Sequence, residues 1–151
     1  AEKSAAAETA PANAAARPVV SAAKTDEKKQ TDKGDFIVEH AGAKNAAYAD
    51  FDRKIREEKL LEKAADTLNR TLVLPRDVHL RAKECGQANA HYDPNDLSIT
   101  LCYELLEHFQ KLFREAGSGE AEADRKMLDA ARFAFLHELG HALVDGYKLP
   151  I

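Results

Sequence analysis

The sequence lacks several features that would assign it to common classes of protein. It has two cysteines in 151 residues, so at most one disulfide can form and the chain is not a disulfide framework. No apolar run approaches the roughly 18 residues of a spanning helix, so we expect no integral membrane segment. The formal net charge is −4 and no basic cluster exceeds Lys28-Lys29, so we expect no nucleic-acid partner.

Residues 1–34 are poor in side chains that could form a core. They hold 11 of the 28 alanines, and Val19 and Val20 are their only larger aliphatic or aromatic residues. Such a segment cannot bury enough surface to offset its ordering entropy. We therefore expect residues 1–34 to be a disordered Ala-rich tether and residues 35–151 to be one folded domain.

The two ends of the chain suggest processing. The chain begins at Ala1 and shows no charged start followed by an apolar core, so the sequence as given contains no signal peptide. The tether composition is typical of a spacer after an export signal, and we expect an exported protein, periplasmic or secreted; an ordinary disordered leader is the alternative. Because the last residues, Leu149-Pro150-Ile151, are apolar, we expect the domain to be C-terminally incomplete.

The apolar pattern predicts an α+β domain. We expect a strand at 36–38, an amphipathic helix over 45–72 and a strand at 78–83, followed by a hairpin whose strands, 87–92 and 97–102, flank a turn at 93–96. Two helices follow, separated by a break at 117–119, the last one over 120–145. If Tyr92 faces Leu97, a Cys85–Cys102 bridge can form, and two buried free thiols are the alternative.

The last helix carries an H-E-x-x-H pattern, His137-Glu138-Leu139-Gly140-His141. Residues four apart lie on one helix face, so both imidazoles can bind one Zn²⁺ at roughly 2.0–2.1 Å and lower the pKa of its bound water to about 7. Glu138 lies about 100° further round the helix, where it suits a general base that takes the proton of this water and delivers it to the leaving amine.

The pattern is specific. With the His and Glu content of this chain, chance would produce it about 0.02 times per chain. The small residues Ala130 and Ala134 precede His137 on the same stripe, and the helix is expected to be largely buried under its other apolar residues, Phe133, Phe135, Leu136, Leu139 and Leu143. A hydrogen-bonded network of buried histidines is the alternative interpretation.

The pattern alone does not complete a catalytic zinc site, which usually has three protein ligands and a water. The metzincin extension is excluded, because Val144 and Tyr147 stand where Gly and His would be required. Asp145 is about 12 Å from His137 along the helix axis, so we expect it to contact His141 rather than the metal, with a solvated carboxylate at the helix end as the alternative. Glu104 and His108 form another i, i+4 pair, which we interpret as surface residues.

Three stretches resemble a bacterial family of unassigned substrate that is expected to consist of zinc metallopeptidases of the zincin clan. They are ARFAFLHELGHALVD at 131–145 with LPI at 149–151, CGQANAHYDP at 85–94, and ITLCYEL at 99–105. The resemblance covers residues 35–151. It implies export, a zincin-like α+β fold with a small, mostly antiparallel sheet packed on helices that include a buried H-E-x-x-H helix, and a third zinc ligand beyond Ile151.

The segment Asn89-Ala90-His91-Tyr92 also resembles the edge strand of thermolysin- and neprilysin-like peptidases, although His91 stands where an aromatic residue is usual. The resemblance implies that Asn89 and Ala90 bind the substrate backbone as an added strand. An ordinary hairpin strand is the alternative. Two functions remain open: a zinc metallopeptidase that cleaves peptide or protein substrates, and a non-catalytic zincin-like binding module with an incomplete metal site.

Overall fold

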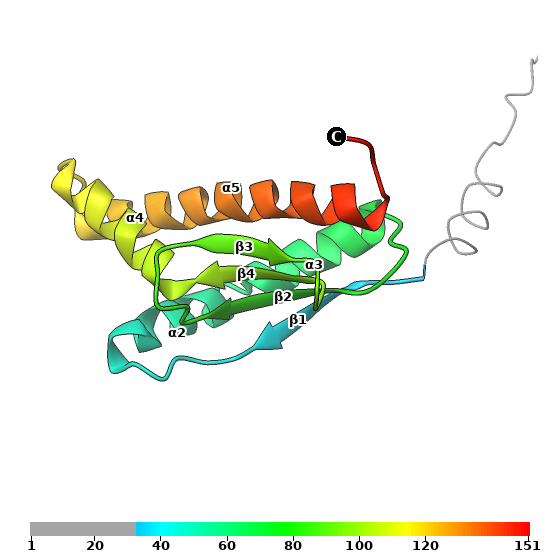
Figure 1. The fold of residues 1–151 in the computed structure, drawn as a ribbon. Coiled ribbons are helices and arrows are strands. Elements are labelled where there is room, and N and C mark those ends of the chain that lie inside the picture. The colour runs from blue at the N-terminus through cyan, green and yellow to red at the C-terminus, as the bar shows by residue number, and fades with distance from the viewer. Residues whose placement is uncertain (1–32) are drawn as a thin grey trace, which may run out of the picture.

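The computed structural model describes residues 33–151, and the expected tether falls outside them except for its last two residues. A four-stranded sheet has the strand order β1-β2-β4-β3, formed by Phe36–His40, Val78–Lys83, Ser98–Cys102 and Ala90–Asp93 in that order (Figure 1). Before β1, Gly34 forms an isolated bridge with Leu74, and a Cβ at Gly34 would overlap the backbone carbonyl of Arg76. A side chain at Gly34 is therefore incompatible with this entry into the sheet.

The sheet is mixed, so the expectation of a mostly antiparallel sheet is wrong. β1 pairs with β2 and β2 pairs with β4 in parallel; β3 and β4 pair antiparallel, as expected of a hairpin. Two helices, α2 (Ala49–Glu57) and α3 (Leu60–Thr71), connect β1 to β2. A crossover connection through helices returns the chain to the same end of the sheet, and the next strand then runs parallel. The expected strand–helix–strand order was therefore already an indication of parallel pairing.

The expected helix over 45–72 is two helices with a short 3-10 turn, η1 (Ala46–Tyr48), before them. Asn45 caps this turn by accepting the Ala47 amide hydrogen. The break falls at Glu58 and Lys59, and Lys59 has a left-handed backbone with φ of 50°. Because this stretch supplies no apolar residue to the buried stripe, the chain can change direction here. α2 then buries Phe51 and Ile55, and α3 buries Leu61 and Ala65.

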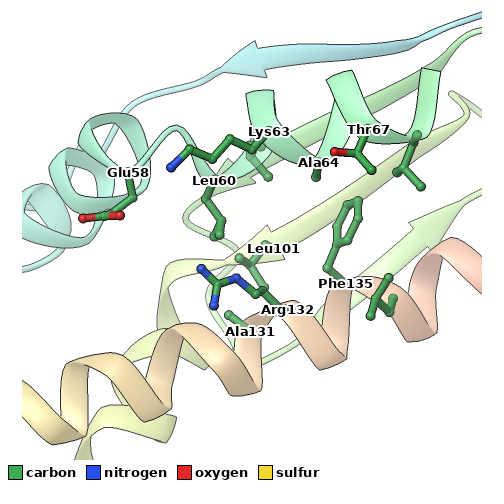
Figure 2. A pocket seen from close by; sticks show the side chains of 12 residues that line it. Glu58, Leu60, Lys63, Ala64, Thr67, Leu101, Ala131, Arg132 and Phe135 are labelled. Atoms are coloured by element: carbon green, nitrogen blue, oxygen red, sulfur yellow. The ribbon is translucent and has the colours of Figure 1, made fainter. Parts of the chain in front are cut away.

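The helices cover one face of the sheet. The alternate residues Val78, Leu80 and Ala82 of β2 are buried on this face, whereas the side chains between them are only partly buried on the other. α3 packs over β1, and α5 (Glu120–Gly146) packs over β3 and β4. An apolar pocket remains between α3 and α5 (Figure 2).

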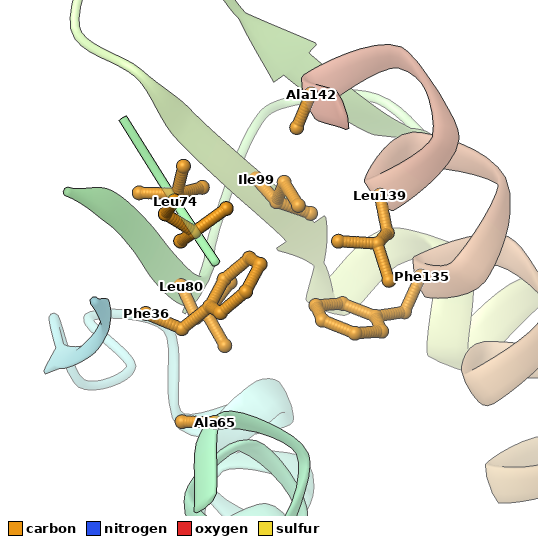
Figure 3. Packing of buried hydrophobic residues seen from close by; sticks show 9 residues of the cluster. Phe36, Ala65, Leu74, Leu80, Ile99, Phe135, Leu139 and Ala142 are labelled. Atoms are coloured by element: carbon orange, nitrogen blue, oxygen red, sulfur yellow. The ribbon is translucent and has the colours of Figure 1, made fainter. Parts of the chain in front are cut away.

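Two clusters of buried side chains join the helices to the sheet. The first lies under α3 and the second half of α5 and contains Phe36, Leu80, Ile99, Phe135 and Leu139 (Figure 3). The second lies where α2, α4 (Tyr103–Glu115) and the first half of α5 meet; its members include Ile55, Leu101, Tyr103, Leu106 and Met127. α5 contributes to both clusters and therefore connects the two parts of the core.

α5 begins and ends close to the expected residues, but it is less buried than expected. Phe135 and Leu139 are buried, whereas Phe133 is 75% exposed and Leu136 is 58% exposed. The sheet and α4 cover one stripe of the helix, and the remaining apolar residues lie outside that stripe. No helix within residues 33–151 is long and apolar enough to cross a membrane.

A disulfide joins Cys85 to Cys102, with 5.5 Å between their Cα atoms. Of the two alternatives, the bridge is therefore the one present. It links the loop before β3 to the last residue of β4. In the hairpin, Tyr92 lies opposite Ile99 rather than Leu97, and the longer loop places Leu97 in a left-handed conformation with φ of 54°. The disulfide is compatible with this register, because Cys102 pairs with the residue before β3.

Reduction of the disulfide is expected to lower the free energy of unfolding by about 3 kcal/mol, because the bridge closes a loop with a sequence separation of 17 and restricts the unfolded chain. Denaturant unfolding with and without reductant measures the difference. A variant with both Cys85→Ala and Cys102→Ala is the control, and reductant should leave its unfolding midpoint unchanged. An unchanged midpoint for the fully reduced wild-type chain would contradict the prediction.

Candidate metal centre

α5 presents the H-E-x-x-H residues outward because its opposite stripe is buried. Phe135, Leu139 and Ala142 pack in the core, whereas His137 and His141 are exposed and Glu138 is partly exposed. The alternative of a buried histidine network does not fit this orientation.

The two imidazoles are close enough to share one ion. The Nε2 atoms of His137 and His141 are 3.2 Å apart, and the rings meet edge to face with centroids 4.9 Å apart. Two nitrogens bound to one tetrahedral zinc at 2.0–2.1 Å lie about 3.4 Å from each other. A carboxylate oxygen of Glu138 lies with these nitrogens in one cluster whose atoms are all within 4.8 Å. Within residues 33–151 no further ligand side chain belongs to that cluster.

The edge strand β3 lies beside the motif and contacts it through its backbone. The Tyr92 amide donates a hydrogen bond of 2.9 Å to Oε2 of Glu138. At the start of the strand, the Asn89 carbonyl accepts the Cys102 amide hydrogen, so it faces β4. Antiparallel pairing alternates the direction of backbone groups, so those of Ala90 and Tyr92 point away from β4. Of the two residues expected to bind substrate, Ala90 therefore has an outward-facing amide and carbonyl.

Tyr92 also contacts α5 through its side chain, a contact that its position in the sequence does not predict. Its hydroxyl donates a 2.8 Å hydrogen bond to Asp145, whose other oxygen accepts one of 2.8 Å from Lys148. Burial and the bond to Asp145 raise the pKa of Tyr92 to about 12. Lys148 and then Tyr92 hold the pKa of Asp145 below its ordinary value. Asp145 also forms a longer ion pair with Arg76, at 3.9 Å, so its partners are Tyr92, Lys148 and Arg76, and His141 is not among them.

An open groove of about 700 Å³ runs between the edge strand and the end of α5. Tyr92 and Pro94 line one side, and Glu138, His141 and Val144 line the other. The last residues of the chain add exposed apolar side chains, since Leu149 is 50% exposed. The groove therefore combines a titratable cluster with an apolar wall and an exposed strand edge.

Glu104, a residue expected at the surface, anchors the loop that leads to β3. Its carboxylate accepts hydrogen bonds from the amides of Cys85 and Gly86, the latter at 2.7 Å. Burial raises its pKa, but these bonds and one from its own amide outweigh burial and hold the pKa below its ordinary value. The sequence feature that could have indicated this role is the position of an acidic residue just after a strand that ends at a cysteine.

The fold and the cluster define an α+β protein with an H-E-x-x-H helix beside the antiparallel edge strand of a mixed sheet. The profile of the family DUF4344, described as "Putative metallopeptidase", matches residues 39–151, and the chain belongs to this family. No curated protein and no solved structure gives a significant match to the chain. The family supports the metallopeptidase class expected from the sequence.

Replacing Glu104 by Gln is expected to lower the free energy of unfolding by about 2 kcal/mol at neutral pH, because an amide is a weaker acceptor for the two backbone donors. The carboxylate pKa is lowered on folding, so its contribution is complete above the unfolded value of about 4.3 and is lost as the pH falls through the lower folded value.

Urea unfolding of both chains between pH 7 and pH 3 tests this dependence. Glu115→Gln, at the exposed end of the same helix, is the matched control and should change the stability little at any pH. A Glu104→Gln difference that stayed constant down to pH 3 would show that the charge of this carboxylate is not what holds the loop.

Proposed function

We propose that this protein is a zinc-dependent metallopeptidase that hydrolyses peptide bonds in peptide or protein substrates. The observation that carries the proposal is the 3.2 Å separation of the His137 and His141 Nε2 atoms, with Glu138 beside them and bonded to an edge strand. Membership of a family described as metallopeptidases supports the same class.

The donor set fits zinc. His137 and His141 would hold the ion through Nε2, and imidazole nitrogen is a preferred zinc ligand. Zinc bound there supplies a Lewis acid and a water whose pKa is near 7. Both histidines are exposed and come from one rigid helix, so their relative position is set before any ligand arrives.

Glu138 is the residue we assign to proton transfer. The Tyr92 amide binds Oε2, which fixes the carboxylate against the edge strand and leaves Oε1 to accept and later release a proton. The general base thus sits between the two imidazoles and the strand on which a peptide would lie. In this proposal the proton acceptor lies next to the peptide bond of a strand added to β3.

We propose that a substrate peptide adds to β3 as a further strand. The outward amide and carbonyl of Ala90 supply two backbone hydrogen bonds, and the side chain of Asn89 lies at the exposed start of the same edge. Backbone bonding gives affinity without dependence on sequence. The apolar wall of the groove, which includes Val144 and Leu149, favours apolar side chains on one side of the cleaved bond.

We propose two further properties of this protein. The H-E-x-x-H helix packed on a sheet with an antiparallel edge strand supports a zincin-like fold. The Cys85–Cys102 disulfide supports an exported protein, periplasmic or secreted, because disulfides persist in oxidising compartments and are rare in the cytosol.

Zinc binding tests the metal ligands directly. The metal-free chain is expected to bind one zinc ion, more weakly than a site with three protein ligands, in competition with a chromophoric chelator. His137→Ala and His141→Ala should each lower the affinity at least about 100-fold, since even the loss of an outer-sphere partner costs 10–100-fold. His108→Ala, an exposed histidine of α4, is the control. Equal affinity in all four proteins would exclude this pair as the ligands.

Hydrolysis of a peptide library, followed by mass spectrometry with and without zinc, tests the catalytic role. Glu138→Gln is expected to retain zinc and to lower the rate about 10²–10⁴-fold, the usual contribution of a positioned acid–base group. Glu120→Gln, in the exposed first turn of the same helix, should leave the rate unchanged. Equal rates for Glu138→Gln and wild type would refute the assignment of Glu138. Zinc binding without any hydrolysis would favour the non-catalytic binding module.

A further inference from the structure

A second cavity, of about 310 Å³, lies between α3 and α5 and has no role in the proposed peptidase site. Leu101 of β4, Ala64 of α3 and Ala131 and Phe135 of α5 line it (Figure 2). None of its lining residues belongs to β3 or to the H-E-x-x-H pattern. The cavity is therefore a separate place on the molecule where an apolar group could be buried.

The charged groups of the cavity lie at one end, and Thr67 adds a neutral hydroxyl near the other. The charged ends of Lys63 and Arg132 lie toward the same end, with Glu58 beyond them, whereas Phe135 lies toward the other (Figure 2). Lys63 has no ion-pair partner among residues 33–151. Arg132 pairs with Asp129, but both side chains are more than half exposed, and such pairs contribute little free energy. Two cations are thus available at the mouth of an apolar pocket.

We propose that this cavity binds the acyl chain of a single-chain anionic amphiphile, with the chain among Ala64, Leu101 and Phe135 and the carboxylate head group between Lys63 and Arg132. The apolar lining accounts for the chain, and the position of the two cations accounts for the charge and for the direction in which the chain enters. The exposed Leu136 at the rim extends the apolar path outward.

The volume sets the length of the chain. A cavity of about 150 Å³ holds benzene, with six carbon atoms. A cavity of about 310 Å³ therefore accommodates roughly twelve carbon atoms or fewer, and it lies at the lower end of the range for small-molecule sites. We accordingly assign a chain of about eight to twelve carbons and use decanoate as the probe.

Calorimetric titration of the full 151-residue chain with hexanoate, octanoate and decanoate, each below the concentration at which it forms micelles, tests the buried chain. Full burial of one methylene contributes up to a fourfold gain in affinity, so decanoate should bind on the order of 100-fold more tightly than hexanoate. Decanol, which lacks the charge, should bind about fivefold more weakly than decanoate, as expected for solvent-exposed ion pairs. Decyltrimethylammonium should bind more weakly still.

Two kinds of variant locate the ligand. Ala64→Phe places a ring in the cavity and should abolish decanoate binding, whereas Ala121→Phe, at an exposed position of α5, should not. A double variant with Lys63→Gln and Arg132→Gln should bring the affinity for decanoate close to that for decanol and leave decanol unchanged. Circular dichroism and thermal unfolding of each variant establish that it is folded before binding is compared.

The proposal fails if decanoate does not bind, or if it binds equally to Ala64→Phe and wild type. Equal binding of decanoate and decanol would overturn the assignment of the head group. Sedimentation of the ligand-free chain examines another occupant: a dimer that Ala64→Phe dissociates, with no decanoate binding, would show that the cavity receives a second copy instead. None of these results depends on zinc or on peptidase activity.

Discussion

The burial of one stripe of α5 against β4 is the constraint on which the candidate site depends. Phe135 and Leu139 are inserted between the helix and the sheet, and burial of side chains of this size contributes about 1.5–3 kcal/mol each. Since successive helical residues are separated by about 100°, fixing these two residues in the core forces His137 and His141 toward solvent. The side chains of the motif face solvent because of apolar packing on the opposite side of the helix. No contact made by the histidines themselves is needed for this orientation.

The edge strand is fixed relative to that helix at several points. Hydrogen bonds to β4 fix β3 along its whole length, and the disulfide and Glu104 fix the loop before β3. Tyr92 joins β3 to α5 through its backbone amide and its side-chain hydroxyl. A strand fixed in this way loses little conformational freedom when another strand adds to it, and binding is then opposed by less entropy. Tyr92 is important in this arrangement because it connects the surface that would bind a peptide to the residue that would move the proton.

The sequence allowed the elements to be predicted better than their arrangement. The H-E-x-x-H helix, the strand at 78–83 and the hairpin follow from local periodicity and turn chemistry, and each is present. The parallel pairing of β1, β2 and β4 depends on where the crossover helices pack, and the break at Lys59 depends on which faces α2 and α3 bury. Likewise, the apolar residues of α5 are spread around the helix, so the sequence could not distinguish the buried Phe135 from the exposed Phe133. These properties are set by contacts between distant segments.

α5 therefore presents different surfaces along a single continuous helix: a buried stripe, the histidine face, and the flank that borders the cavity beside α3. Leu136 and His137 are neighbours in sequence but belong to different surfaces. Coupling between two ligand sites requires an element with two arrangements that each ligand favours differently. The core holds α5 through Met127, Phe135 and Leu139, which span about half of its length, and so opposes a rotation that would alter both surfaces together. A ligand beside α3 and a metal at the histidines should accordingly bind independently, although both rest on the same helix.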